Sequence, residues 1–271
     1  MRLRWLGCSG YEIITDRGTV IYIDPWLTSH AFNAPISASD IERADAVLLT
    51  HAHFDHAEDL PEIVKRTGAV LLAGKEEING LNQIERLPRD QLRPVQWDDI
   101  VQVEGCKIHV TKAKHMTQAQ IEVSIPSIKE SGDKSGEFQA KVNEFQAKVR
   151  EILPKGFLIT MESGLRIWHL GSCIPIPELA TYSEVLRPQI AIVQVPPKFE
   201  DSIGLENVKA ICQKGIGPSI ILPHHHDKIF GDQSTITDVN LFVKGVKQAF
   251  PELKVLNPKL GRYYQFELQY W

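Results

Sequence analysis

Three histidines and one aspartate occupy four of the six positions 51–56, in the sequence HAHFDH. His51 and His53 are two positions apart, so in an extended segment both side chains project to the same side and can bind one metal ion. Asp55 and His56 lie just beyond, where the chain turns, and can bind a second ion a few ångströms away. Two such ions can share a water molecule, lower its pKa and deliver hydroxide to an electrophile. The spacing therefore indicates a hydrolytic metal centre rather than a loop of solvated histidines.

The elements around this segment place it at the edge of a sheet. Residues 46–49 form a short apolar run that predicts a buried strand, and residues 57–64 begin like a helix with acidic residues in its first turn. The point where a strand ends and a helix begins is where α/β layers usually bind ligands. We therefore expect the metal-binding side chains to line one edge of a sheet.

Short predicted strands recur along most of the chain, separated by tight turns. A meander is expected over residues 3–23, and two hairpins over residues 100–111 and 157–170. Helices are expected around residues 205–213 and 239–250. Many short strands with helices in each half favour an α+β architecture, in which two sheets pack face to face with helices outside.

The motif His-x-His-x-Asp-His after a strand resembles that of the metallo-β-lactamase superfamily. Other landmarks of that superfamily follow in order along nearly the whole chain: GCSG at 7–10, IDPWLT at 23–28, His115 at a strand end, WHLGSC at 168–173 and LPHHH at 222–226. Their order is most similar to the branch that contains ascorbate-phosphate lactonases and phospholipase-D-like members. The resemblance implies the αββα metallo-β-lactamase fold, two packed mixed β-sheets flanked by helices, with residues 1–271 as a single domain.

The two predicted metal positions need further ligands from elsewhere in the chain. His115 is expected to complete the first position with His51 and His53, because it directly follows the end of a predicted strand. The alternative, His109, lies inside that strand. For the second position the resembled branch points to His225, with His224 as the alternative. A histidine of this late cluster that binds no metal could instead face the substrate.

Residues 171–173, Gly-Ser-Cys, depart from the superfamily pattern. Relatives carry an aspartate at the position of Ser172, and that aspartate bridges both metals. A serine hydroxyl is a weak neutral ligand, so the second ion is expected to be absent or weakly held, and the first ion to be tightly bound. The Cys173 thiolate is an alternative zinc ligand, and Cys8 is a less favoured one.

Two further residues are expected to support the ligands. The Asp24 carboxylate can accept a hydrogen bond from the free ring N–H of a ligand histidine, although it could instead cap the strand end before Pro25. His169 lies three residues before Ser172, so strand alternation would point the two side chains to opposite faces. His169 is therefore expected behind the ligands or in the core.

An insertion is expected at about residues 126–154, where the sequence FQAKV occurs twice. Phe138, Val142 and Phe145 then share one helical face. The simplest interpretation is a helix packed on the sheet. The alternatives are a lid beside the cleft or a contact in a homo-oligomer.

Composition restricts the class of partner. The net charge is −4 with no dense Lys/Arg run, which disfavours nucleic-acid binding. Four scattered cysteines without a Cys-x-x-Cys pair favour a reduced, cytoplasmic setting. The N-terminal residues lack the apolar core of a signal peptide, and no run reaches the length of a membrane span.

The resemblance implies a metal-dependent hydrolase, using zinc or manganese, in which metal-bound hydroxide attacks a small-molecule substrate. An anionic ester, lactone or phosphoester is the expected substrate, and Asp55 is the expected catalytic residue that orients the water. One alternative is a phosphodiesterase that acts on lipid-like substrates. Another is a metal-binding regulatory protein whose catalysis is weakened because Ser172 replaces the bridging aspartate.

Overall fold

The computed structural model describes residues 1–28, 34–117, 140, 144, 153–198, 200–227 and 236–268. The predicted helical face of Phe138, Val142 and Phe145 lies outside these residues, so its role stays a prediction. None of the helices described has the length and apolar character that crossing a bilayer requires.

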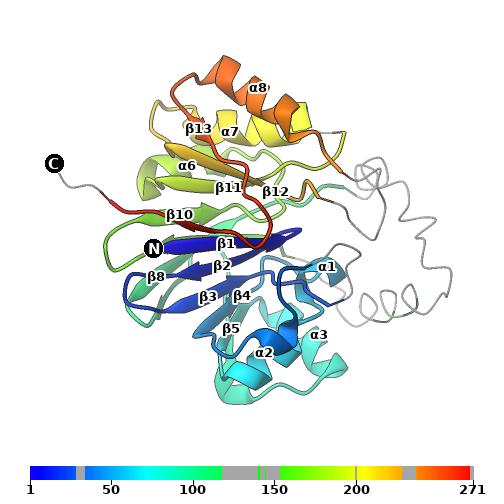
Figure 1. The fold of residues 1–271 in the computed structure, drawn as a ribbon. Coiled ribbons are helices and arrows are strands. Elements are labelled where there is room, and N and C mark those ends of the chain that lie inside the picture. Colours follow the sequence, from blue (N-terminus) through cyan, green and yellow to red (C-terminus); the bar gives the residue numbers. More distant parts are fainter. Residues whose placement is uncertain are drawn as a thin grey trace.

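Two seven-stranded sheets form the centre of the molecule (Figure 1). The first has the strand order β14-β1-β2-β3-β4-β5-β6. Its strands are β1 (Arg2–Gly7), β2 (Gly10–Ile14), β3 (Val20–Ile23), β4 (Ala46–Leu48), β5 (Val70–Ala73), β6 (Leu92–Pro94) and β14 (Tyr263–Gln265). From β3 to β6 the pairs are parallel, and the pairs β14-β1, β1-β2 and β2-β3 are antiparallel.

The second sheet has the order β13-β12-β11-β10-β9-β8-β7 and repeats the same mixture. Its strands are β7 (Ile100–Val103), β8 (Cys106–Lys112), β9 (Lys155–Thr160), β10 (Arg166–His169), β11 (Ile190–Gln194), β12 (Ile220–His224) and β13 (Lys254–Val255). Pairs from β7 to β10 are antiparallel, and pairs from β10 to β13 are parallel. The prediction of two mixed sheets is therefore confirmed.

Three apolar layers hold these sheets and their helices together. The layer between the sheets takes side chains from both, such as Leu3 and Ile21 from the first and Ile108 and Phe157 from the second. One outer layer covers the first sheet with α1 (Phe54–Ala57), α2 (Leu60–Thr67) and α3 (Lys75–Ile84). The other covers the second sheet with α6 (Glu178–Leu186), α7 (Leu205–Cys212) and α8 (Val239–Ala249). The predicted αββα sandwich is confirmed.

Short helical turns connect several of these elements. They are η1 (Ala38–Asp40), η2 (Arg89–Gln91) and η4 (Glu200–Gly204), a π-helix that leads directly into α7.

The segment after β3, which includes Trp26 and Leu27, packs against the histidine-rich loop and the helices that follow it. Trp26 is fully buried, contacts Phe54 edge-on with ring centroids 6.3 Å apart, and donates its indole N–H to Glu58 over 2.8 Å. The Asp59 carboxylate accepts the backbone N–H of Leu27 over 2.6 Å. These contacts fix the start of α1 and α2 against the chain that carries Asp24.

Candidate metal centre

The carboxyl ends of parallel strands from both sheets meet at one edge of the sandwich. Asp24 follows β3, His51 follows β4 after two residues, and His225 follows β12 directly. Such an edge is where open α/β sheets place their binding sites. The side chains that the sequence analysis selected therefore come from segments that the fold brings together.

His51, His53 and His115 form a first group. One ring nitrogen from each lies within 4.8 Å of those of the other two, and Nε2 of His51 is 3.0 Å from Nδ1 of His53. His51 is fully buried, whereas His53 and His115 are half-buried. The structure thus brings together the three histidines predicted for the first metal position.

Hydrogen bonds determine the tautomer of two of these rings, His51 and His115. The Thr50 hydroxyl donates to Asp24 Oδ2 over 2.6 Å, so at 3.0 Å it accepts the Nδ1–H of His51. His115 donates its Nδ1–H to the carbonyl of Met116 over 3.0 Å. In both rings Nε2 carries the lone pair that a metal ion would take, and in His51 it faces Nδ1 of His53.

The local electrostatics keep this group neutral. Burial lowers the pKa of His51 well below its usual value, and the neighbouring histidines lower it further. Burial lowers the pKa of His53 to about 3, and it also lowers the pKa of His115. Neutral imidazole is the form that binds metal ions. Three converging, neutral and partly buried imidazoles therefore fit a divalent transition metal.

A second group lies next to the first. Cys8 Sγ, Asp55 Oδ2 and His225 Nε2 lie within 4.8 Å of one another. His56 Nε2 is 3.4 Å from His225 Nε2 and 3.7 Å from Asp55 Oδ2. The rings of His51 and His56 are 4.1 Å apart between centroids, so the two groups are adjacent. This arrangement fits two neighbouring ions.

Asp24 connects the two groups. This buried carboxylate accepts the backbone N–H of Thr50 at 2.8 Å, the Thr50 hydroxyl at 2.6 Å and the Nδ1–H of His56 at 2.8 Å. It therefore orients His56 directly and His51 through Thr50. Asp24 has a φ of 43°, a left-handed conformation that a non-glycine residue keeps only where its surroundings require it.

Charge in the second group is set by opposing effects. Burial lowers the pKa of His56, but the carboxylates of Asp55 and Asp24 outweigh it, and the pKa is raised. Burial raises the pKa of Asp55, but His56 and His225 outweigh it, and the pKa is lowered. Burial lowers the pKa of His225 to about 4. Asp55 is thus an anion at neutral pH.

Of the three late histidines, the structure brings His225 to the ligand atoms. His225 has a φ of 59° and directs Nε2 toward Asp55. His224 instead faces Ser9, with its Nδ1 3.1 Å from the hydroxyl, and its unbonded Nε2 is buried. His226 stacks on Trp5 with ring centroids 4.7 Å apart.

Residues 169–173 do not enter the two groups by any contact that the structure records among the described residues. His169 accepts the N–H of Gly171 at Nδ1 and donates Nε2–H to the Ser9 carbonyl, so both nitrogens serve the backbone. Ser172 is buried, and its hydroxyl has no partner among the described residues.

Cys173, predicted as an alternative zinc ligand, lies in the apolar layer under α6 and α7. Its thiol donates to the Ile174 carbonyl over 3.0 Å. The structure therefore does not place Cys173 at the metal centre. The thiol at the centre is that of Cys8, which the sequence analysis had favoured less.

Two polar side chains beside the centre were not predicted from the sequence. One is Thr50, which sits between Asp24 and His51. The other is Asp227, whose Oδ2 accepts the backbone N–H of Cys8 at 2.8 Å and whose pKa burial raises to about 6. Their positions directly before and after the histidine clusters were the signal that could have identified them.

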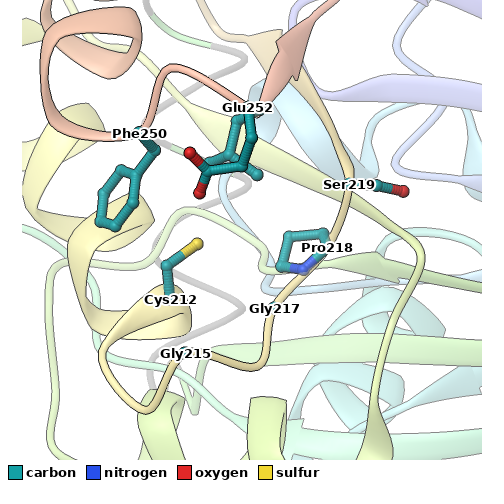
Figure 2. Close-up of a pocket in the computed structure, with 8 residues that line it drawn as sticks. Cys212, Gly215, Gly217, Pro218, Ser219, Phe250 and Glu252 are labelled. Carbon is teal, nitrogen blue, oxygen red and sulfur yellow. The ribbon is translucent and has the colours of Figure 1, made fainter.

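A separate hollow of about 400 Å³ opens at the other end of the second sheet (Figure 2). Cys212 and Phe250 line it, together with Ser219, which directly precedes β12. His225 follows the opposite end of that strand. This hollow is therefore remote from the metal centre, and burial raises the pKa of its Cys212 thiol to about 11.

Comparison with known proteins gives consistent matches over almost the whole chain. The beta-lactamase superfamily domain matches residues 2–225. A UPF0173 metal-dependent hydrolase of Polynucleobacter asymbioticus is 24% identical over 268 residues, covering 97% of this chain and 86% of its own.

Two solved structures share the fold. Igni18, described as a metallo hydrolase from Ignicoccus hospitalis, superposes with a TM-score of 0.72 at 22% identity and covers 99% of both chains. An isothiocyanate hydrolase from Delia radicum gut bacteria superposes with a TM-score of 0.69 at 16% identity, covering 99% of this chain and 100% of its own.

Proposed function

The chain belongs to the beta-lactamase superfamily and is a metal-dependent hydrolase, and from that premise we propose the residues that make it one. His51, His53 and His115 bind a first divalent ion. Asp55, His56 and His225 bind a second ion beside it. The single observation that carries this proposal is the convergence of these nitrogen and carboxylate atoms, from three separate segments, at one sheet edge.

The donor set favours zinc. Five of the six proposed ligands are imidazoles, which suit zinc, whereas manganese prefers carboxylate, carbonyl and water oxygens. The first ion, which keeps an open position, would when bound polarise the substrate and acidify water.

The chain's own residues would do the remaining work. Asp55, kept ionised by His56 and His225, orients the attacking water and accepts a hydrogen bond from it at a carboxylate oxygen. Asp24 and Thr50 hold the ligand rings in position, so that little reorganisation is needed during the reaction.

The charge of the site supports a small anionic substrate. Two dications bring more positive charge than the carboxylates of Asp24 and Asp55 offset, and the ligand histidines are mostly neutral. A positive site attracts anionic groups and stabilises the negative charge that develops on a carbonyl or phosphoryl oxygen. We therefore propose an anionic ester, lactone or phosphoester as the substrate class.

One experiment tests function and site together. Purified protein and its His53→Ala and His109→Asn variants would be analysed for bound metal and screened against lactones, phosphomonoesters and phosphodiesters. His109 is the control, because it lies inside β8 beside Asp98, outside both ligand groups. We expect chelator-sensitive hydrolysis in the wild type and His109→Asn, and neither hydrolysis nor tight metal binding in His53→Ala. Full metal content in His53→Ala would refute the assignment.

A further inference from the structure

We propose that Cys8 is the anionic fourth ligand of the second ion, and that its thiolate supplies the negative charge that Ser172 cannot. This inference rests on the proposed metal centre and extends it. It reverses the expectation that the second ion is weakly held.

Distances around Cys8 carry the proposal. Cys8 Sγ is 3.6 Å from Asp55 Oδ2 and 3.6 Å from His225 Nε2, and these last two atoms are themselves 3.6 Å apart. A zinc ion with bonds of about 2.3 Å to sulfur and 2.0–2.2 Å to nitrogen or oxygen separates its tetrahedral ligand atoms by about 3.3–3.6 Å. The triangle of sulfur, oxygen and nitrogen therefore already has the dimensions of one face of a zinc site.

The backbone of Cys8 is held in a strained conformation, in which the thiol lies beside Asp55 and His225. Its φ is 47°, in the left-handed region. The Cys8 N–H donates to Asp227 at 2.8 Å, and its carbonyl accepts the N–H of His225 at 3.1 Å and the indole N–H of Trp5 at 3.1 Å. Strain of this kind persists where the surroundings over-determine it, and it is concentrated at functional sites.

The buried Cys173 shows what a structural thiol looks like here. The Cys173 thiol donates to a backbone carbonyl inside an apolar layer. The Cys8 thiol instead has a carboxylate oxygen and an imidazole nitrogen as its polar neighbours, and both are metal-ligand atoms. Cys8 also packs in the apolar layer over the first sheet, but its sulfur lies beside two proposed ligand atoms, as a metal ligand would.

The charge of the second ion's ligands also favours ligation by Cys8. With Ser172 neutral, Asp55 would be the single anion among the proposed ligands of the second ion. On binding, the Cys8 S–H bond would break, a sulfur–metal bond would form, and the proton would leave to solvent. Two anionic ligands then neutralise the dication. A thiolate ligand also selects zinc or another soft metal over manganese or magnesium at this position.

Cobalt substitution tests the proposal directly, because thiolate ligands give cobalt(II) a near-ultraviolet charge-transfer band. Wild type, Cys8→Ser, Cys8→Asp and Cys212→Ser would be loaded with zinc or cobalt, dialysed, and assayed for bound ions per chain. Cys212→Ser is the matched control, because its thiol lies in the remote hollow. Circular dichroism would check folding of each variant.

We expect two ions and the charge-transfer band in the wild type and Cys212→Ser. Cys8→Ser should retain one ion and lose the band. Cys8→Asp should keep the second ion without the band, as should Cys8→Ser combined with Ser172→Asp. These two variants show that charge, and not misfolding, explains the loss.

Failure of this proposal is distinguishable from failure of the proposed function. If Cys8→Ser kept two ions and an unchanged band, the role of Cys8 would be refuted while the metal centre would stand. The same would follow if the wild type bound one ion only, at His51, His53 and His115. A wild type that binds no ion, or whose His53→Ala variant binds as many, would overturn the metal centre itself.

Discussion

Nδ1 of His56 donates to the carboxylate of Asp24 across 2.8 Å, and both side chains are buried. The same carboxylate reaches His51 through the Thr50 hydroxyl. One acidic side chain thus sets the ring orientation in both ligand groups, and its removal should affect both ions.

Asp24→Asn tests this role. The amide nitrogen cannot accept a hydrogen bond. If it replaces Oδ2, the His56 ring and the Thr50 hydroxyl both lose their acceptor, and if it replaces Oδ1, the Thr50 backbone N–H does. Loss of such a supporting contact typically costs about 10–100-fold in metal affinity. We expect weakening of that order for total zinc binding, measured by competition with a chelating dye. Asp40→Asn, at an exposed capping site, is the control; equal affinity in the two variants would count against the role of Asp24.

Thr50→Val separates the two groups. Valine has nearly the shape of threonine but cannot link Asp24 to Nδ1 of His51, so the first ion should weaken while His56 keeps its direct contact. A roughly tenfold loss is expected, with recovery in Thr50→Ser. Isothermal titration of the metal-free protein would resolve the two binding steps. Loss confined to the second step would contradict the proposed linkage.

The pH dependence of metal-free protein stability follows from the buried histidines. Burial lowers the pKa of His53 to about 3 and that of His225 to about 4, and burial together with the neighbouring histidines lowers that of His51. An unfolded histidine titrates near about 6.5. Below that pH the unfolded chain binds protons that the folded chain does not, so the free energy of unfolding should fall as pH falls.

His56 acts in the opposite direction. Burial lowers the pKa of His56, but the carboxylates of Asp55 and Asp24 raise it by more, so the net shift is upward. The stabilising contribution of His56 is therefore lost as pH rises. Histidines with a lowered pKa outnumber it, because burial also lowers the pKa of His115, His169, His224 and His226. We therefore expect a net loss of stability between about pH 6.5 and 4 in urea unfolding of metal-free protein. His53→Ala should show a shallower dependence. A flat profile would show that these rings are protonated in the folded state.

Lys155, in β9 of the second sheet, contacts both α3 and the metal loop. Its side chain forms a buried ion pair with Glu77, and its backbone binds Thr50. Lys155 Nζ lies 2.7 and 2.8 Å from the Glu77 carboxylate oxygens, and the Lys155 backbone N–H donates to the Thr50 carbonyl at 2.8 Å. Removing one partner of a buried pair costs about 3–5 kcal/mol. We expect destabilisation of that size for Glu77→Ala in chemical denaturation.

Glu85→Ala is the control for that variant, because Glu85 pairs with Lys65 on the surface. An exposed pair contributes about 0–1 kcal/mol. Similar losses in the two variants would mean that the buried pair has no special structural role.

The sequence indicated which polar side chains lie together more readily than which helices surround them. The spacing of His51, His53, Asp55 and His56 is local, so it could be interpreted without tertiary information. Helix α3 was not identified, because its inward-facing Glu77 interrupts the apolar stripe and is explained by Lys155, 78 positions away along the chain.

The choice between Cys173 and Cys8 could not be made from sequence either. Strand β10 ends at His169, and Gly171 then takes a φ of 68°, so strand alternation no longer determines where the following side chains point. A Cβ at Gly171 would lie 2.4 Å from the Lys155 carbonyl oxygen, which explains the glycine. Cys8 reaches the ligands through a contact with a residue 217 positions away.

Anomalous scattering at the zinc edge, from crystals of the zinc-loaded protein, tests the central claim most directly. We predict two adjacent peaks, one among His51, His53 and His115, and one among Asp55, His56 and His225 with Cys8 Sγ bonded to it. A single peak at the histidines would remove the second site and the role of Cys8. Zinc bound elsewhere, with both groups free of metal, would contradict the account as a whole.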